Sequence, residues 1–197
     1  MKRKKVVSTA KSITYHSQVV TEYNKIKPLP VGYVLKVTDD WCAAFVSVVY
    51  NKLKYKDILE CSVPRMIELA KKKKIWHERS FKNPDIGDII VYDWDGNADG
   101  DHVGIITYKY GGLITTREGN VYNNFGERHI YMDDSRIIGY ITPPFEDEAA
   151  PVQEVKYKTI DDIVNSIIKG EFGNGEDRKQ NLYNYFQKLV NDKLGGK

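Results

Sequence analysis

The sequence predicts an α+β fold followed by a small helical unit. Three observations support this class. Apolar residues recur at helical spacing before Pro84, and short β-branched and aromatic segments separated by Gly, Asp or Asn follow it. Two amphipathic segments come after residue 155. A chain of 197 residues, 41% of them hydrophobic, can form one full domain and an appendage.

Helices are expected in the first part of the chain. A loose helical pattern covers residues 5–24, and the proline-containing segment 25–37 is interpreted as a loop. Residues 38–53 show one apolar face at helical spacing. Residues 62–74 begin with a serine suited to capping and a proline in the first turn, which predicts another helix.

Strands are expected after Pro84, because the segments there are short and rich in residues that favour strands. Gly111 and Gly112 predict a tight hairpin between two of them. The helix of residues 38–53 would pack across the resulting antiparallel sheet. The segments cover residues 87–94, 102–110, 113–119, 128–132 and 137–142.

The chain is expected to contain two domains. Residues 1–145 would form the main domain, and the proline-rich, acidic segment 146–155 would be a linker. Residues 156–197 would form a small helical domain with helices at about 159–169 and 176–194, joined by the turn GEFGNG.

Composition excludes several classes of protein. A net charge of +3 without a basic cluster of the nucleic-acid-binding type argues against nucleic acid as a partner. No segment reaches the roughly 18 apolar residues that a bilayer span needs, so no membrane insertion is expected. The basic N-terminal residues lack an apolar stretch of signal-peptide length. We therefore expect synthesis in the cytoplasm without a signal peptide, and release by another route.

Cys42 lies near the start of the predicted helix 38–53. Thr38 or Asp39 can cap this helix, and the free amide protons and the helix dipole there stabilise a thiolate. A small apolar residue in the core is the alternative, because free cysteines are often buried. The other cysteine, Cys61, precedes the predicted helix 62–74 and is interpreted as structural or incidental. A disulfide between the two cysteines stays open as an alternative, but two cysteines do not make a disulfide framework.

His102 begins a predicted strand directly after a polar turn, an exposed position that suits a general base. Glu118 and Asn120 end the next strand, and adjacent antiparallel strands bring such ends together. A cysteine at a helix start, a histidine and an orienting polar residue form a nucleophile–base–orienter set. The other histidines lack this context; they are His16, His77 and His129.

The motifs WCAAFVS, GDIIVYDW with DHVGI, and EGN occur in the order and spacing of the CHAP family, which residues 5–145 resemble. These are papain-like cysteine amidases and peptidases that cut peptidoglycan. The resemblance implies Cys42 as the nucleophile and His102 as the general base. It implies that Glu118 and Asn120 orient and polarise His102, and which of the two contributes more stays open.

Residues 156–194 resemble the CW-seven repeat, a cell-wall-binding repeat of some phage lysozymes, through the motif IDDI with GEFGNGEDRKQNL. A glycine turn beside an arginine at a helix start can bind an acidic sugar or a carboxylate. A plain turn between two helices is the alternative. The resemblance places these residues near the glycan–peptide ligand: Phe172, Gly173, Asn174, Gly175, Asp177 and Arg178.

Two further features suggest ligand contacts. Trp41 and Trp94 flank the key motifs and are candidates for lining a substrate groove, with core packing as the alternative. The loop DGNADG matches the start of a calcium-binding EF-hand, but Ile106 stands where the final glutamate belongs. A turn that shapes the approach to His102 is the alternative. The candidate calcium ligands are Asp95, Asn97, Asp99 and Asp101, with Asp93 as a further donor.

A cysteine hydrolase joined to a wall-binding repeat resembles a phage endolysin or an autolysin. The resemblance implies bacterial peptidoglycan as the partner, no required cofactor other than a potential calcium ion, and most directly N-acetylmuramoyl-L-alanine amidase activity. A stem or bridge endopeptidase is the first alternative, and a non-catalytic wall-binding protein is the second. Self-association through the apolar C-terminal helices is a further alternative.

Overall fold

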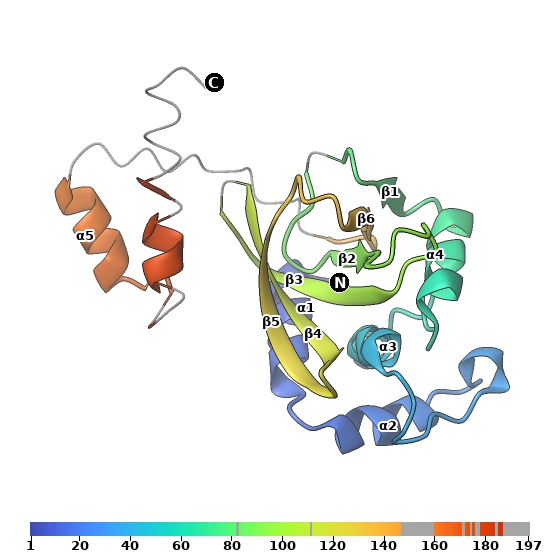
Figure 1. The fold of residues 1–197 in the computed structure, drawn as a ribbon. Helices are drawn as coiled ribbons and strands as arrows, with labels where there is room; N and C mark the ends of the chain where they lie inside the picture. Colours follow the sequence, from blue (N-terminus) through green and yellow to red (C-terminus); the bar gives the residue numbers. More distant parts are fainter. Residues whose placement is uncertain are drawn as a thin grey trace. The chain divides into compact units, whose positions relative to one another are not determined.

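A computed structural model gives the fold of the protein (Figure 1). The chain divides into two compact units, Met1–Val152 and Gln153–Lys197. This boundary falls within the predicted linker 146–155, of which only Glu146 is described. The structure describes residues 1–81, 83–110, 112–146, 160–170, 172–173, 175, 178–183 and 185–186.

Two helices, not one, occupy residues 5–24. Between them Ile13 has the extended backbone angles φ −94° and ψ 114°, and its side chain is fully buried. The break lets both helices turn an apolar face to the same core, an arrangement that one straight helix does not allow. The described helices of the first unit are α1 (Arg3–Ser12), α2 (His16–Asn24), the short 3₁₀ turn η1 (Pro30–Gly32), α3 (Cys42–Lys52) and α4 (Val63–Lys72).

The central helix α3 begins at Cys42, four residues later than the sequence predicts. Asp39 does not cap it, because its carboxylate accepts hydrogen bonds from the Lys36 amide and the Tyr33 hydroxyl. Trp41 occupies the N-cap position without a side-chain cap. The predicted cap is therefore wrong, and the amide protons of the first turn of α3 have no side-chain acceptor from the cap residue.

The described strands form one six-stranded antiparallel sheet in the order β1-β6-β2-β3-β4-β5. The predicted hairpin between β3 and β4 is confirmed. The α+β class is also confirmed, with helices in the N-terminal half and strands after them. The strands are β1 (Trp76–Glu78), β2 (Ile89–Tyr92), β3 (His102–Tyr110), β4 (Leu113–Val121), β5 (Asn124–Tyr131) and β6 (Ile137–Ile141).

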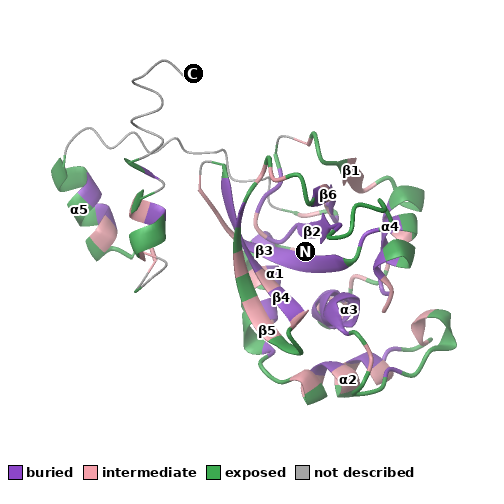
Figure 2. Ribbon diagram, viewed as in Figure 1, coloured by how far each residue is buried: buried purple, intermediate pink, exposed green. Residues whose placement is uncertain are grey.

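Helix α3 is buried on all sides, as Figure 2 shows. It packs against β3 and β4 and also against α1, α2 and α4. Val103 and Ile105 of β3 belong to this core, whereas Ile106 belongs to a second cluster with Tyr92 and Ile114. Alternate residues of a strand point to opposite faces of the sheet, which explains the division. The packing fixes the start of α3 beside the first residues of β3.

The second unit contains α5 (Ile160–Ile168) and a helical stretch over residues 178–183. Phe172 is 1% exposed and packs edge-to-face on Tyr185, with ring centroids 5.8 Å apart. The predicted helix 176–194 is described only in part, and its end lies outside the described residues. No helix among the described residues is long and apolar enough to cross a membrane.

Candidate active site

Cys42 and His102 meet where the start of α3 lies beside the start of β3. Cys42 is the first residue of α3 and is 5% exposed, and His102 is the first residue of β3 and is 8% exposed. The Cys42 thiol is one of the groups whose interaction with His102 raises the pKa of the imidazole. The expectation that His102 is exposed is wrong, because the rings of Tyr92 and Trp94 lie 5.9 and 6.3 Å from its ring and shield it.

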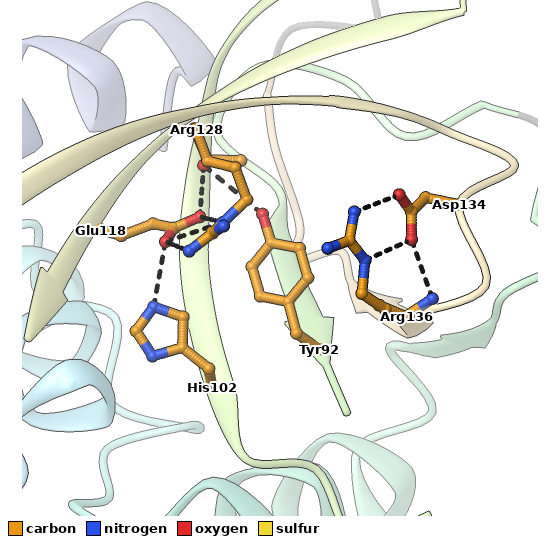
Figure 3. A network of polar contacts seen from close by, with 7 residues as sticks. Tyr92, His102, Glu118, Arg128, Asp134 and Arg136 are labelled. Carbon is orange, nitrogen blue, oxygen red and sulfur yellow. Dashed lines mark hydrogen bonds and ion pairs between the residues drawn. The ribbon is translucent and has the colours of Figure 1, made fainter. Parts of the chain in front are cut away.

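Glu118 lies behind His102 on the neighbouring strand. Nε2 of His102 donates a hydrogen bond to Oε2 of Glu118 over 3.0 Å (Figure 3), so Nδ1 of the ring takes no part in this bond. The register explains this contact. Gly104 pairs with Glu118, so His102 and Glu118 are diagonal neighbours on one face of the sheet.

The carboxylate of Glu118 is fully buried and held by several donors. Thr116 donates from Oγ1 to Oε1 over 2.6 Å. Arg128 donates from Nε over 3.1 Å and from Nη2 over 3.1 Å, one bond to each carboxylate oxygen. Burial alone would raise the pKa of Glu118, but these bonds and the one from His102 lower it to about 2. Glu118 therefore stays ionised at neutral pH.

The same contacts set the protonation of His102. Burial alone would lower its pKa, but hydrogen bonds and charge interactions with Cys42 and Glu118 outweigh burial and raise the pKa to about 9. At neutral pH the imidazole is therefore held in its protonated form beside the thiol. A histidine beside a cysteine is the group that handles the proton of the thiol when the sulfur reacts.

Asn120 occupies a different position from Glu118. Its backbone is left-handed, with φ 64°, and its Nδ2 donates to Oδ1 of Asp40 over 2.7 Å. Within the described residues Asn120 makes no hydrogen bond to His102. Of the two predicted orienting residues, the structure therefore brings only Glu118 to the imidazole. Asn120 instead joins the end of β4 to the segment that leads into α3.

The two tryptophans differ in exposure. Trp41 is fully buried between His16, which stacks on it at 4.5 Å, and Phe125, which meets it edge-on at 4.9 Å. The prediction that Trp41 lines a substrate groove is therefore wrong, because its ring belongs to the core. Trp94 is 39% exposed and lines an open cavity of about 460 Å³ together with His102.

The other histidines contact groups other than the Cys42 thiol among the described residues. His16 stacks on Trp41, His77 stacks on Phe81, and His129 bonds through Nδ1 to the hydroxyl of Thr115. Cys61 is half-buried, and its thiol contacts Glu60 at 3.6 Å. The described structure therefore supplies one cysteine–histidine pair, that of Cys42 and His102.

The acidic loop before β3 gathers carboxylates. Ligand oxygens of Asp93, Asp95 and Asp101 lie within 4.8 Å of one another, and oxygen donors of this kind fit calcium. Of the predicted ligands, Asn97 and Asp99 are not among these three carboxylates, and Oδ1 of Asn97 accepts the backbone amide of Asp99. The donor set that fits a calcium ion is therefore Asp93, Asp95 and Asp101, with Asp93 in place of Asn97 and Asp99.

The predicted wall-binding residues are only partly described. Phe172 is buried in the core of the second unit, so the prediction that it contacts a ligand is wrong. Arg178 donates from Nε to the carbonyl of Gly173 over 3.2 Å, and Gly175 is exposed. Asn174 and Asp177 lie outside the described residues.

Arg128, Arg136 and Asp40 are site residues that the sequence did not reveal. Arg128 reaches Glu118 because it pairs with Thr116 across β4 and β5, a register that local patterns do not specify. Arg136 follows β5 in a turn, where its charge resembles that of any solvated turn residue. The alternation of side chains along β5 does not by itself show that Arg128 lies on the same face as Glu118. The pairing of β5 with β4 is also needed.

An α+β fold with a buried cysteine–histidine pair fits the class of cysteine- and histidine-dependent amidohydrolases and peptidases. Residues 32–120 match the CHAP domain, a stretch that includes Cys42, His102 and Glu118. Residues 161–194 match the CW_7 repeat. These two matches support a peptidoglycan-acting hydrolase of the amidase or endopeptidase type. A search of curated proteins found no match.

Proposed function

We propose that the protein is an endolysin-type N-acetylmuramoyl-L-alanine amidase, in which Cys42 is the nucleophile. The observation that carries this proposal is the continuous arrangement of the Cys42 thiol, the His102 imidazole and the ionised Glu118. Each member supports the next: Glu118 fixes the ring and its charge, and His102 holds the proton of the thiol.

The first half of the reaction forms an acyl-enzyme. The sulfur of Cys42 attacks the carbonyl carbon of the scissile amide, and His102 holds the proton that leaves the thiol. The tetrahedral intermediate then collapses as His102 gives this proton to the departing amine. The products of this half are a thioester on Cys42 and the free amine.

The second half restores the enzyme. His102 accepts a proton from water, and the resulting hydroxide attacks the thioester carbon and releases a carboxylic acid and the thiol. Glu118 does not exchange protons in either half, because a carboxylate with a pKa of about 2 is a poor base. Its role is to hold the imidazole and to stabilise its positive charge.

Backbone amides at the start of α3 supply the oxyanion site in this proposal. The helix starts at Cys42 without a side-chain cap, so the first-turn amides face the reacting sulfur with their positive dipole end. Negative charge develops on the carbonyl oxygen as the sulfur attacks. Donors aimed at that oxygen lower the barrier, typically by about 3 kcal/mol for each donor.

The CW_7 repeat supports action on assembled walls. A wall-binding unit on the same chain raises the local concentration of the catalytic unit at its substrate without new contacts to the scissile bond. The amide bond that we propose is cut joins the glycan to the peptide. A repeat bound to the wall would hold the enzyme near this bond. We also propose that the protein acts on the wall after release from the cell that makes it.

Mass spectrometry of digested peptidoglycan tests the proposed function. Purified walls are treated with the wild-type protein, and Cys42→Ala and Cys61→Ser serve as matched variants. New glycan chains without peptide and peptides with free N-terminal alanine are the expected products for the wild type and for Cys61→Ser. New termini within the stem or bridge would instead identify an endopeptidase. Equal fragments from Cys42→Ala, or none from any protein, would contradict a cysteine hydrolase.

A further inference from the structure

Two arginines meet at the exposed tryptophan of the cavity. The guanidinium carbon of Arg128 lies 4.7 Å from the centre of the Trp94 ring, and that of Arg136 lies 5.6 Å from it. All three side chains line the cavity of about 460 Å³ that also contains His102. Contacts with an aromatic ring hold guanidinium groups in place. One wall of the cavity beside His102 therefore carries two positioned cations.

Each arginine uses only one edge for its internal partner. Arg128 binds Glu118 through Nε and Nη2, and Arg136 binds Asp134 through the same pair of nitrogens over 2.9 and 2.7 Å. Figure 3 shows these two ion pairs on either side of Tyr92. Within the described part of the chain, Nη1 of neither arginine has a hydrogen-bond partner. A guanidinium group has five donors, so each keeps a free pair of N–H groups.

The accessibility and charge of this wall suit an anion. The Arg128 and Arg136 side chains are 32% and 55% exposed, so a ligand in the cavity can reach them. The described lining of the cavity contains one acidic residue, Glu127, and three basic residues, His102, Arg128 and Arg136. Carboxylates are the usual partners of arginine, because planar N–H groups match their two oxygens.

We propose that this cavity binds a carboxylate of the peptide beside the scissile amide, with the free N–H groups of Arg128 and Arg136 as donors. This inference rests on the proposed function and names the charged group of its substrate. The enzyme would thus prefer stem peptides whose acidic residue or C-terminus is free over peptides in which that group is amidated. The acidic residue and the C-terminus both supply a carboxylate. Matched substrates that differ at one of these two groups show which carboxylate is bound.

Four synthetic peptidoglycan fragments test the inference. They share one sequence, and the internal acidic residue and the C-terminus are each present as acid or as amide. For the wild-type protein we expect amidation of one of the two groups to lower kcat/KM roughly tenfold, the size of a charge-assisted hydrogen bond. In Arg136→Gln the kcat/KM for the acid fragment divided by that for the amide fragment should be close to one. In Arg136→Lys this ratio should be intermediate.

Lys25→Gln is the matched control, since it removes one exposed positive charge that pairs with Glu22 on α2. It should leave the ratio unchanged. Equal kcat/KM for all four fragments, or an unchanged ratio in Arg136→Gln, would overturn the carboxylate site. If the wild-type protein cuts none of the fragments, the proposed function fails, and binding to Cys42→Ala by calorimetry decides the site. The carboxylate site is supported if Cys42→Ala binds the acid fragments more tightly than the amide fragments and the double variant Cys42→Ala with Arg136→Gln loses this difference. Equal binding of acid and amide fragments by Cys42→Ala overturns the site.

Discussion

Gly104 faces Glu118 across β3 and β4, and the missing side chain of Gly104 provides the space that the Glu118 side chain occupies. A Cβ atom at position 104 would lie 2.7 Å from Cγ of Glu118 and 3.3 Å from its Oε1. The glycine of the DHVGI motif thus lets a buried carboxylate reach the histidine two residues earlier in the same strand.

Gly104→Ala should therefore lower activity while the protein still folds. The added methyl group displaces Glu118 from Nε2 of His102, and a shift of about 1 Å in a catalytic group can reduce the rate roughly 100-fold. The measurement is kcat on soluble fragments together with thermal unfolding. Gly112→Ala is the control, because its Cβ would meet only Tyr131 at 3.9 Å. Full activity in Gly104→Ala would mean that the position of Glu118 does not matter.

Activity should decline on the alkaline side as His102 loses its proton near its pKa of about 9. The folded state raises this pKa from 6.5, so the stabilising contribution of His102 is fully present below about 6.5 and is lost as pH rises through about 9. Glu118→Gln removes a carboxylate that favours the imidazolium, so the alkaline limb should move to lower pH. A pH–rate profile and an NMR titration of His102 measure this shift, and an unmoved limb would argue against the proposed coupling.

Calcium should bind to the acidic loop and stabilise the protein. Carboxylates of Asp93, Asp95 and Asp101 converge there, and they repel one another when no cation lies between them. Added calcium should raise the melting temperature by a few degrees, and EDTA should reverse the increase. Asp95→Asn should weaken the response, whereas Asp133→Asn, an exposed change elsewhere, should not. An identical melting temperature with calcium and with EDTA would leave the loop as a turn.

A chain that ends after Glu146 should fold and cut soluble fragments. It retains Phe145, whose ring lies 4.0 Å from the guanidinium of Arg3, and the ion pair of Glu146 with the N-terminal amine. It should bind purified walls at least about tenfold more weakly than the full chain, because it lacks the repeat. Sedimentation with walls measures this binding.

Arg178→Ala in the full chain should reproduce part of that loss. Its Nε holds the Gly173 carbonyl, so circular dichroism of the variant is needed to show that the helices persist. Equal wall binding by the full chain, the shortened chain and Arg178→Ala would assign another role to the C-terminal unit, such as self-association.

Local patterns predicted the strands of the hairpin and the two residues that meet at the start of α3. A cysteine near a helix start and a histidine after a polar turn are local signals, and the hairpin register brings Glu118 to His102. Trp41 was misplaced because adjacency to Cys42 does not reveal which way its side chain points; its ring lies in the core with α3. The three-residue edge strand β1 was missed because so short a segment has no periodicity.

The turn between β4 and β5 contributes a cavity residue that can be substituted without changing the other residues of the site. Tyr122 is 96% exposed at the tip of this hairpin, and its backbone is left-handed, with φ 49°. It lines the same cavity as His102, yet among the described residues its side chain supports no other group of the site. A directed-evolution library at Tyr122 would therefore sample new substrate preferences while the strand pairing and the reacting thiol stay unchanged.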